Sequence, residues 1–317
     1  MSACIILAAG QGKRMRSPLP KVAHPVLGVP MVLRVIRQAL AAGLDRPVVV
    51  IGSGRELVKP LLDAEGVPWV VQEEQRGTAH AVSCGLSGVG SESVVVLLGD
   101  VPLLRSRTIT HLEARRRESG AGVAVLTTVP PDPAGYGRMI VEDGRLRRIV
   151  EERDATPEQR AIREINTGLM AFDGKLLPSM LARITPDNDQ GEYYLTDAVE
   201  VAWSMGAECI AVRAEDWREV AGVNDRVQLA EATANLRMTV VRELLMAGVD
   251  IPDADSVWIE ETVVIGEGVR VGRGCRLSGR TVIGDGCSLG DGCVLTSAIL
   301  PPGTTLDPFT VIGKHGS

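Results

Sequence analysis

The sequence predicts an α/β protein: a Rossmann-like domain with a mainly parallel sheet, then a helical arm and a short left-handed parallel β-helix. Three observations carry this prediction. Short β-branched runs alternate with amphipathic helical patterns over residues 1–226, one long helical pattern covers 227–250, and a six-residue repeat fills 251–317. The length of 317 residues agrees, because about 150 residues per domain predicts two domains.

The first part contains short apolar runs with the length and composition of buried strands. Amphipathic stretches separate them, and this alternation is typical of a mainly parallel sheet that is covered on both faces. The expected strands are 4–7, 48–51, 69–72, 94–98, 123–127, 165–172 and 209–212. The expected helices are 31–42, 78–86, 108–118 and 195–205.

A hairpin and a long helix complete this part of the chain. Residues 139–141 and 146–150 flank the sequence Glu-Asp-Gly-Arg, whose composition is typical of a tight turn. In residues 224–247 apolar side chains recur at three- and four-residue steps, and Gly248 stands where a helix stop belongs. We therefore expect a connecting arm there.

The last part of the chain repeats every six residues. Aliphatic residues stand at 259, 265, 271, 277, 283, 289 and 295 and, after a one-residue slip, at 300, 306 and 312. A small or β-branched residue precedes each of them by two positions, which is typical of a β-helix whose hexapeptides form the sides of a triangular coil. In this register Cys275, Cys287 and Cys293 point inward, so we expect core residues rather than metal or redox groups.

Composition excludes several classes of protein. The 34 Lys and Arg residues against 40 Asp and Glu give a net charge of −6, which disfavours a nucleic-acid partner. The first apolar run is too short for a signal-peptide core, and no run approaches the ~18 apolar residues of a membrane helix. The six cysteines form no C-x-x-C pair or zinc spacing. We expect a cytoplasmic protein with reduced thiols and no membrane partner.

A glycine-rich turn follows the first strand. The segment 7–15 reads L-A-A-G-Q-G-K-R-M, and such a turn invites a phosphate because its bare backbone N–H groups can approach the oxygens. Met15 occupies the third glycine position of the dinucleotide fingerprint, which therefore fails. Arg14 and Lys21 supply two cations just beyond the turn. Without further support, a tight turn with solvated charges remains the alternative.

The motifs, taken in order, resemble those of sugar-phosphate nucleotidylyltransferases. With the hexapeptide repeat behind them, they are similar to the N-acetylglucosamine-1-phosphate uridylyltransferase half of a bifunctional bacterial enzyme family whose second half is a glucosamine-1-phosphate acetyltransferase. The similarity covers nearly the whole chain. The matching segments are 7–15, 20–21, 72–81, 99–103, 135–138, 149–151, 164–168, 190–197 and 222–226.

The resemblance implies a role for each matching residue. Arg14 and Lys21 would be catalytic, acting on the phosphates, and Mg²⁺ would be the cofactor. Asp100, at the end of a strand, and Asn224 would bind the metal; a carboxylate and an amide oxygen suit a hard cation. The nucleotide would contact Leu7, Ala8, Ala9, Gly10, Gln72, Gly77 and Thr78, and the N-acetylated sugar would contact Gly137, Glu151 and Asn166. Gln72, Gly77 and Thr78 would form the uracil end, where Gln72 offers both a donor and an acceptor, as the uracil edge does.

The implied reaction joins UTP to N-acetylglucosamine 1-phosphate, giving UDP-N-acetylglucosamine, a peptidoglycan precursor, and pyrophosphate. The sugar phosphate oxygen attacks the α-phosphorus in line and is already anionic, so no general base is needed. None of the 4 histidines is therefore assigned a catalytic part. The resemblance also implies a homotrimer formed through the β-helix. The family's acetyl-transfer residues lie on later coils, so no acetyltransferase activity is expected.

Departures from the family pattern bear on selectivity. Lys13 stands where Thr is usual, Ala79 replaces a common Gly, and Leu98 stands where close relatives often have Tyr. Alternatives are a nucleotidylyltransferase for another sugar 1-phosphate or for dTTP, and a non-catalytic regulatory subunit that binds a nucleotide sugar. A hexapeptide acyltransferase comes last, because it would need further coils and a catalytic histidine.

Overall fold

The computed structural model describes residues 2–87 and 92–313. The chain divides into two compact units, Met1–His24 with Pro30–Gln228, and Pro25–Val29 with Leu229–Ser317. Among the described residues, no helix combines the length and apolar character needed to cross a bilayer.

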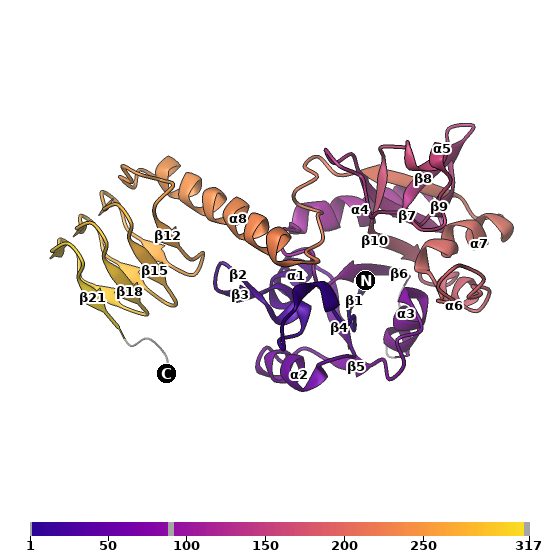
Figure 1. Ribbon diagram of the computed structural model, residues 1–317, viewed down its shortest axis with the longest axis horizontal. Coiled ribbons are helices and arrows are strands. Elements are labelled where there is room, and N and C mark those ends of the chain that lie inside the picture. Colours follow the sequence, from indigo (N-terminus) through magenta and orange to yellow (C-terminus); the bar gives the residue numbers. More distant parts are fainter. Residues whose placement is uncertain (1, 88–91, 314–317) are drawn as a thin grey trace. The chain divides into compact units, whose positions relative to one another are not determined.

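A mixed sheet forms the centre of the first unit (Figure 1). Its main path runs β11-β7-β10-β6-β1-β4-β5. The predicted strands are all present, as β1 (Ser2–Ala8), β4 (Asp45–Ile51), β5 (Trp69–Val71), β6 (Ser93–Leu98), β7 (Val123–Thr128), β10 (Ile165–Asp173) and β11 (Cys209–Arg213). Their apolar composition is explained by burial, since every residue of β7 is buried.

Along the main path most neighbouring strands are parallel, which confirms the predicted sheet type. β1 pairs in parallel with both β4 and β6, and β7 pairs in parallel with β11. β10 is the exception, because it runs antiparallel between β6 and β7. The predicted hairpin is β8 (Arg138–Glu142) and β9 (Arg145–Val150), joined by Asp143 and Gly144 with φ of 50° and 73°. Positive φ at both positions is the geometry of a two-residue hairpin turn.

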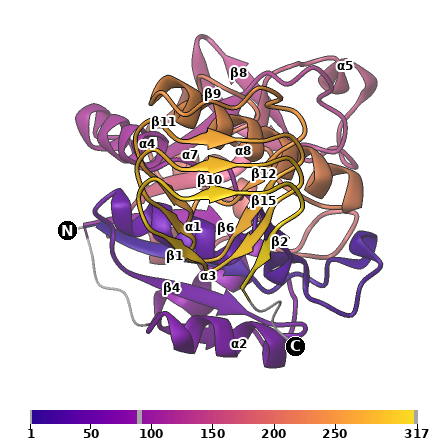
Figure 2. The same cartoon turned by 90° about the vertical axis from the view of Figure 1, so that its left-hand side faces the viewer.

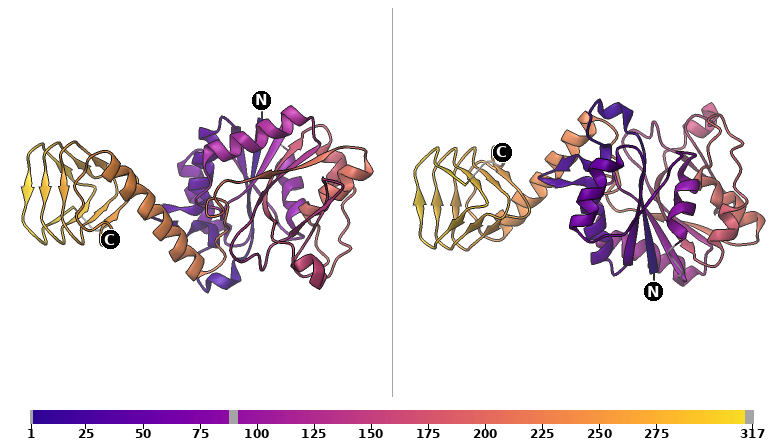
Figure 3. Two further views of the ribbon diagram at one scale, coloured as in Figure 1. Left: turned by 90° about the horizontal axis from the view of Figure 1, so that it is seen from above. Right: turned by 90° about the horizontal axis from the view of Figure 1, so that it is seen from below.

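Helices lie on both faces of this sheet, as Figure 3 shows from above and below. α1 packs against α4, and α3 packs against α6. The α-helices are α1 (Met31–Ala41), α2 (Arg55–Ala64), α3 (Thr78–Leu86), α4 (Ser106–Ser119), α5 (Pro157–Arg160), α6 (Leu177–Leu181) and α7 (Ala198–Ser204). The described residues also form the short 3-10 helices η1 (Lys13–Met15), η2 (Lys21–Ala23) and η3 (Leu195–Asp197). The helix predicted over 195–205 is therefore η3 followed by α7.

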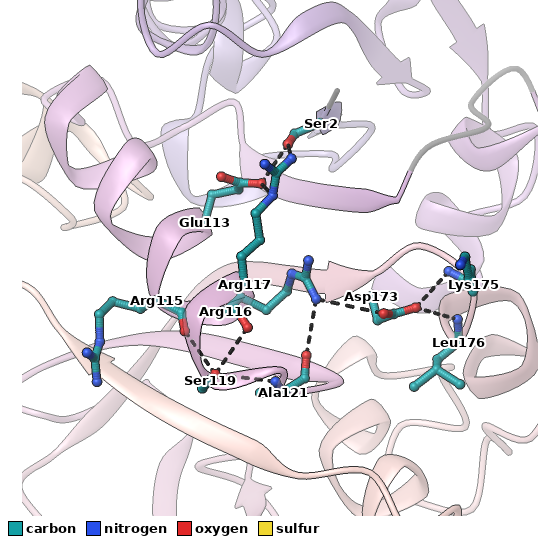
Figure 4. Close-up of polar contacts among 10 residues, drawn as sticks. All are labelled: Ser2, Glu113, Arg115, Arg116, Arg117, Ser119, Ala121, Asp173, Lys175 and Leu176. Atoms are coloured by element: carbon teal, nitrogen blue, oxygen red, sulfur yellow. Dashed lines mark hydrogen bonds and ion pairs between the residues drawn. The ribbon is translucent and has the colours of Figure 1, made fainter.

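Polar contacts fix α4 at the edge of the sheet where β1 begins (Figure 4). Ser2 donates to Glu113 at 2.6 Å and accepts from Arg117 at 2.7 Å. Arg116, only 6% exposed, donates to the Ala121 carbonyl at 3.2 Å and lies 3.8 Å from Asp173 at the end of β10. Burial lowers the pKa of Arg116, and the charge of Asp173 opposes this shift. We interpret these contacts as ones that stabilise the fold.

The second unit contains a long helix, a small hairpin and a stack of coils. α8 (Arg226–Met246) begins in the first unit and accounts for the arm predicted over 224–247. Its Val241 is fully buried in the apolar core of the coils, and Arg237 donates to the carbonyls of Ala254, Asp255 and Val257 at 2.9–3.0 Å. The hairpin is β2 (Pro25–Val26) and β3 (Val29–Pro30).

The coils confirm the predicted short left-handed β-helix, and Figure 2 shows them stacked. Parallel sheets of orders β12-β15-β18-β21, β13-β16-β19 and β14-β17-β20 form the three faces. The strands are β12 (Trp258–Ile259), β13 (Val264–Ile265), β14 (Arg270–Val271), β15 (Arg276–Ser278), β16 (Val282–Ile283), β17 (Ser288–Leu289), β18 (Val294–Thr296), β19 (Ile299–Leu300), β20 (Thr305–Leu306) and β21 (Val311–Ile312).

The register of the coils confirms both the repeat and its slip. Leu277 pairs with Leu295, eighteen positions on, whereas Ile283 pairs with Leu300 after the slip. The three cysteines that were expected to point inward are free thiols with at most 1% exposure, as core residues should be: Cys275, Cys287 and Cys293.

Candidate active site

The predicted site residues begin where β1 and β6 end. The chain passes from β1 outward to β4 and β5 and then returns to place β6 on the other side of β1. Ligands of open α/β sheets bind at such a reversal of strand order, outside the carboxyl ends of the strands. Leu7 and Ala8 end β1 here, Ala9 follows them, and Asp100 lies two residues after β6. The Gly99 N–H donates to the Leu7 carbonyl at 2.9 Å, which holds the two strand ends together.

The glycine-rich turn is shaped by close backbone approach. Gly12 has φ of 60°, and a Cβ there would lie 2.6 Å from the Cβ of Lys21, so the turn and η2 can meet only at a glycine. A Cβ on Gly10 would meet no atom within 4 Å. Gly10 therefore faces open space, as expected of backbone that a ligand approaches. Arg14 is exposed on η1 and forms no ion pair with the rest of the described chain.

Lys21, Asp100 and Asn224 converge on one point. The Lys21 ammonium forms an ion pair with the Asp100 carboxylate and donates to the Asn224 Oδ1 at 3.1 Å. The side chains of Lys21 and Asp100 are only 14% and 15% exposed. The Val223 N–H donates to the Asp100 carbonyl at 2.8 Å, which holds the segment bearing Asn224 beside β6. The structure thus brings together three predicted residues that are distant in sequence.

This convergence fits a divalent cation. The Lys21 ammonium marks a position where a carboxylate and an amide oxygen both reach one positive charge. Hard cations such as Mg²⁺ use few protein ligands of this kind and complete their shell with water and phosphate. No cluster of three or more His, Cys, Asp or Glu side chains suited to a metal occurs within the described residues. The donor set therefore suits a metal shared with a phosphate ligand.

The three residues predicted to contact the base lie together after β5. Gln72 is 3% exposed, and its Nε2 donates to the Gly77 carbonyl at 3.1 Å. Gly77 has φ of 111°, and a Cβ there would lie 2.5 Å from the Tyr193 carbonyl oxygen, so only glycine fits. The Thr78 hydroxyl accepts from the Leu195 N–H at 2.9 Å and therefore already has a structural partner.

The residues predicted to bind the sugar also lie together. Asn166 on β10 donates its N–H to the Gly137 carbonyl at 2.8 Å. A Cβ on Gly137 would come within 3.4 Å of the Glu151 Oε2, so the carboxylate lies directly beside this glycine. The Asn166 Oδ1 accepts from the Gly168 N–H at 2.9 Å, which fixes the amide group and turns its nitrogen to the other side.

Two carboxyl groups near the residues predicted to bind the sugar have raised pKa values. Burial raises the pKa of Glu151, while a hydrogen bond from Thr196 at 3.1 Å opposes the shift. Burial also raises the pKa of Asp197 to about 6, and the neighbouring charge of Glu151 adds to the effect. Perturbed carboxyl groups of this kind concentrate at functional sites.

Several neighbours of these residues were not predicted as site residues. The Leu98 side chain abuts Gly168, where a Cβ would lie 2.6 Å from Leu98 Cδ1. Tyr136 lies near Asp100: burial raises the pKa of its hydroxyl, and the charge of Asp100 adds to this. Tyr136 stands within the motif G-Y-G-R, so the motif was a signal for it. Asp197 belongs to the motif Y-Y-L-T-D, but only the fold shows that its charge interacts with that of Glu151.

The chain matches two family models. Residues 4–166 match the MobA-like NTP transferase domain, and residues 262–297 match the bacterial transferase hexapeptide (six repeats). It is also similar to proteins named bifunctional protein GlmU: 44% identical over 270 residues to one from Trichlorobacter lovleyi, and 46% over 270 to one from Pelotomaculum thermopropionicum. These alignments cover 84% and 83% of this chain but only 59% and 58% of the relatives, so the chain spans under two thirds of their length.

Proposed function

Because this chain belongs to the MobA-like NTP transferase family, we propose that it transfers the uridylyl group of UTP to N-acetylglucosamine 1-phosphate. The products would be UDP-N-acetylglucosamine and pyrophosphate. The observation that supports this most is the convergence of Lys21, Asp100 and Asn224 beside an open glycine-rich turn. A phosphate-binding turn next to a cation and two oxygen ligands is what nucleotidyl transfer requires.

The chain's own groups would position and neutralise the phosphates. Asp100 and Asn224 would hold Mg²⁺, which when bound would neutralise charge on the reacting phosphate. Lys21, already beside both ligands, and the exposed Arg14 would neutralise the remaining negative charge of the triphosphate. An oxygen of the sugar phosphate would form a bond to the α-phosphorus as the bond to the pyrophosphate oxygen breaks. This oxygen is anionic, so no side chain has to accept a proton.

Base and sugar would lie at opposite ends of this phosphate region. Gln72 and the Gly77 backbone would contact the base, because they lie at the end of β5, two strands from β1. The sugar would lie near β10, where the Glu151 carboxylate and the fixed Asn166 amide suit paired hydroxyl and acetamido groups. Leu98 next to Gly168 makes this end more apolar than a tyrosine would.

We assign the β-helix to assembly. Val264, Val282 and Ile299 stack on one of its faces and are 59%, 39% and 77% exposed. An aliphatic column of this kind is suited to burial against a second copy of the chain. With the hexapeptide repeats, it supports a homotrimer, for which light scattering should give about three times 33.7 kDa. The acyltransferase alternative predicts acetyl transfer from acetyl-coenzyme A. The described coils contain no histidine, so we expect no such transfer.

Pyrophosphate release tests the proposed reaction directly. The enzyme is supplied with Mg²⁺ and a matrix of nucleoside triphosphates and sugar 1-phosphates. We expect the fastest release with UTP and N-acetylglucosamine 1-phosphate. Faster release with dTTP or with glucose 1-phosphate would reassign the substrate, and nucleotide-sugar binding without any release would favour the regulatory subunit.

A further inference from the structure

A series of side-chain contacts connects Gln72, the proposed base-binding residue, to two side chains of α3. The Gln72 Nε2 lies 3.1 Å from the Gly77 carbonyl oxygen and 3.0 Å from the His80 Nδ1. On the other side of the imidazole ring, the Nε2 of His80 lies 3.8 Å from the Cys84 Sγ, one helical turn along α3. The reaction described above uses neither His80 nor Cys84.

The chemistry of Gln72, His80 and Cys84 determines where their hydrogens lie. A backbone carbonyl only accepts hydrogen bonds, so the group of Gln72 that faces Gly77 must be the amide nitrogen. An amide nitrogen has two hydrogens and no lone pair to offer, so the His80 Nδ1 beside it must be the acceptor. The ring hydrogen is then on Nε2, where it points to the Cys84 sulfur, a weak acceptor.

Both N–H groups of Gln72 are therefore used within the protein. One goes to Gly77 and the other to His80, while no donor in the described chain reaches the Gln72 Oε1. Gln72 can present only this oxygen to a ligand. The sequence suggested that Gln72 could offer both a donor and an acceptor to the base, and the geometry removes the donor.

We propose that His80 is a positioning residue for base selection. By accepting the second amide hydrogen, it acts with the Gly77 carbonyl to hold the Gln72 amide in one orientation and keeps Oε1 available to the base. This inference rests on the proposed function and deepens it. We place Oε1 opposite N3 of the base, where a carbonyl oxygen favours a base whose N3 carries a hydrogen, as in uracil and thymine. In cytosine N3 is a lone pair, which would face the oxygen unfavourably. The device thus selects UTP or dTTP over CTP.

Cys84 contacts the His80 ring at Nε2, the nitrogen that does not face Gln72, and stabilises this arrangement. Burial raises the pKa of its thiol, so the sulfur is a neutral group that can accept weakly from the His80 Nε2 hydrogen. Its position four residues along α3 places it beside the same face of the helix. The thiol therefore favours the tautomer that leaves Nδ1 free to accept.

The experiment compares three variants by calorimetric binding of UTP and CTP in the presence of Mg²⁺. His80→Leu removes the acceptor, whereas His80→Asn places an amide oxygen at the position of Nδ1. His111→Leu, on the exposed side of α4, is the matched control. We expect His80→Leu to weaken UTP binding about tenfold with CTP binding little changed, since one of the two hydrogen bonds that hold the amide is lost. His80→Asn should restore the preference for UTP to within about threefold.

Steady-state kinetics distinguish positioning from a merely structural role. In His80→Leu the KM for UTP should rise about tenfold while kcat stays within about twofold. Should His80→Leu fail to fold, Cys84→Ala against Cys84→Ser gives the same comparison, with a smaller loss of UTP preference expected only for Cys84→Ala. An unchanged UTP to CTP ratio in a folded His80→Leu variant, or equal losses in His80→Leu and His80→Asn, would overturn the proposal. Absence of pyrophosphate release by the wild-type chain would instead overturn the proposed function.

Discussion

The ionised form of Asp197 is destabilised in the folded protein, and removal of its charge should make the protein more stable at neutral pH. The residue precedes α7, yet its side chain forms no capping hydrogen bond with that helix. Burial raises its pKa from 3.8 to about 6, with the charges of Glu151 and Glu200 adding to the shift. Asp197→Asn keeps the shape of the side chain and removes the charge.

The magnitude follows from the two pKa values. The interval from 3.8 to about 6 corresponds to about 3 kcal/mol, because each pKa unit is worth about 1.4 kcal/mol. The folded protein binds this proton more tightly than the unfolded chain does, so stability falls as pH rises from about 4 to about 6. Above that range the penalty is fully present. Asp197→Asn should therefore raise the free energy of unfolding by up to about 3 kcal/mol at pH 7.5 and by little at pH 4.

Urea denaturation at several pH values measures this effect. Asp187→Asn, at an exposed position, is the control and should change nothing at either pH. A pH-independent effect of Asp197→Asn, or a loss of stability that grows above pH 6, would refute the reasoning. Because the charges of Asp197 and Glu151 interact, we also expect the apparent KM for the sugar phosphate to change.

Three further predictions concern the metal, the sugar and the opposite edge of the sheet. Asp100→Ala, or chelation of the metal, should lower turnover by ~10³-fold or more in the pyrophosphate assay, because the ion is the largest local charge; retention of most activity would contradict the assignment. Asn166→Ala should raise the KM for the sugar phosphate about tenfold with the KM for UTP unchanged; equal changes in both would argue for general disruption. Arg116→Leu should cost about 1–3 kcal/mol in urea denaturation, because Asp173 and the Ala121 carbonyl lose a buried partner, without changing KM; a change in KM would contradict a structural role.

Local sequence pattern predicted the long, strongly periodic elements and missed those that depend on distant contacts. α2 contains Pro60 and was not predicted, and β2 and β3 are only two residues each. The helix expected over 108–118 begins at 106 because Gln38 accepts from the Ser106 N–H at 2.8 Å, and Glu219 accepts from the Arg105 N–H at 3.0 Å. Side chains that cap a helix from elsewhere in the chain leave no mark in the pattern of the helix itself.

The candidate site, too, could be predicted from the sequence only in part. The spacing of motifs identified residues that the fold does bring together, such as Gly137, Glu151 and Asn166. It could not show which of their polar atoms are free. The two amide hydrogens of Gln72 and the hydroxyl of Thr78 have partners within the protein. Such partners are fixed by a few tenths of an ångström in the packed structure, which composition and spacing do not contain.

The slip in the β-helix shows where this solenoid tolerates a change of length. Ser278 pairs with Thr296, and the next paired residues are Val282 with Ile299, so the later corner has one residue fewer than the earlier one. Ser297 adopts a φ of 50° to close the shorter corner, and all three faces continue in register beyond it. Corners can therefore absorb deletions, and by the same logic insertions, while pairing between coils restores the faces. For engineering, a peptide is better grafted at residue 297 than within any flat side, because there the scaffold has already accepted a change in length.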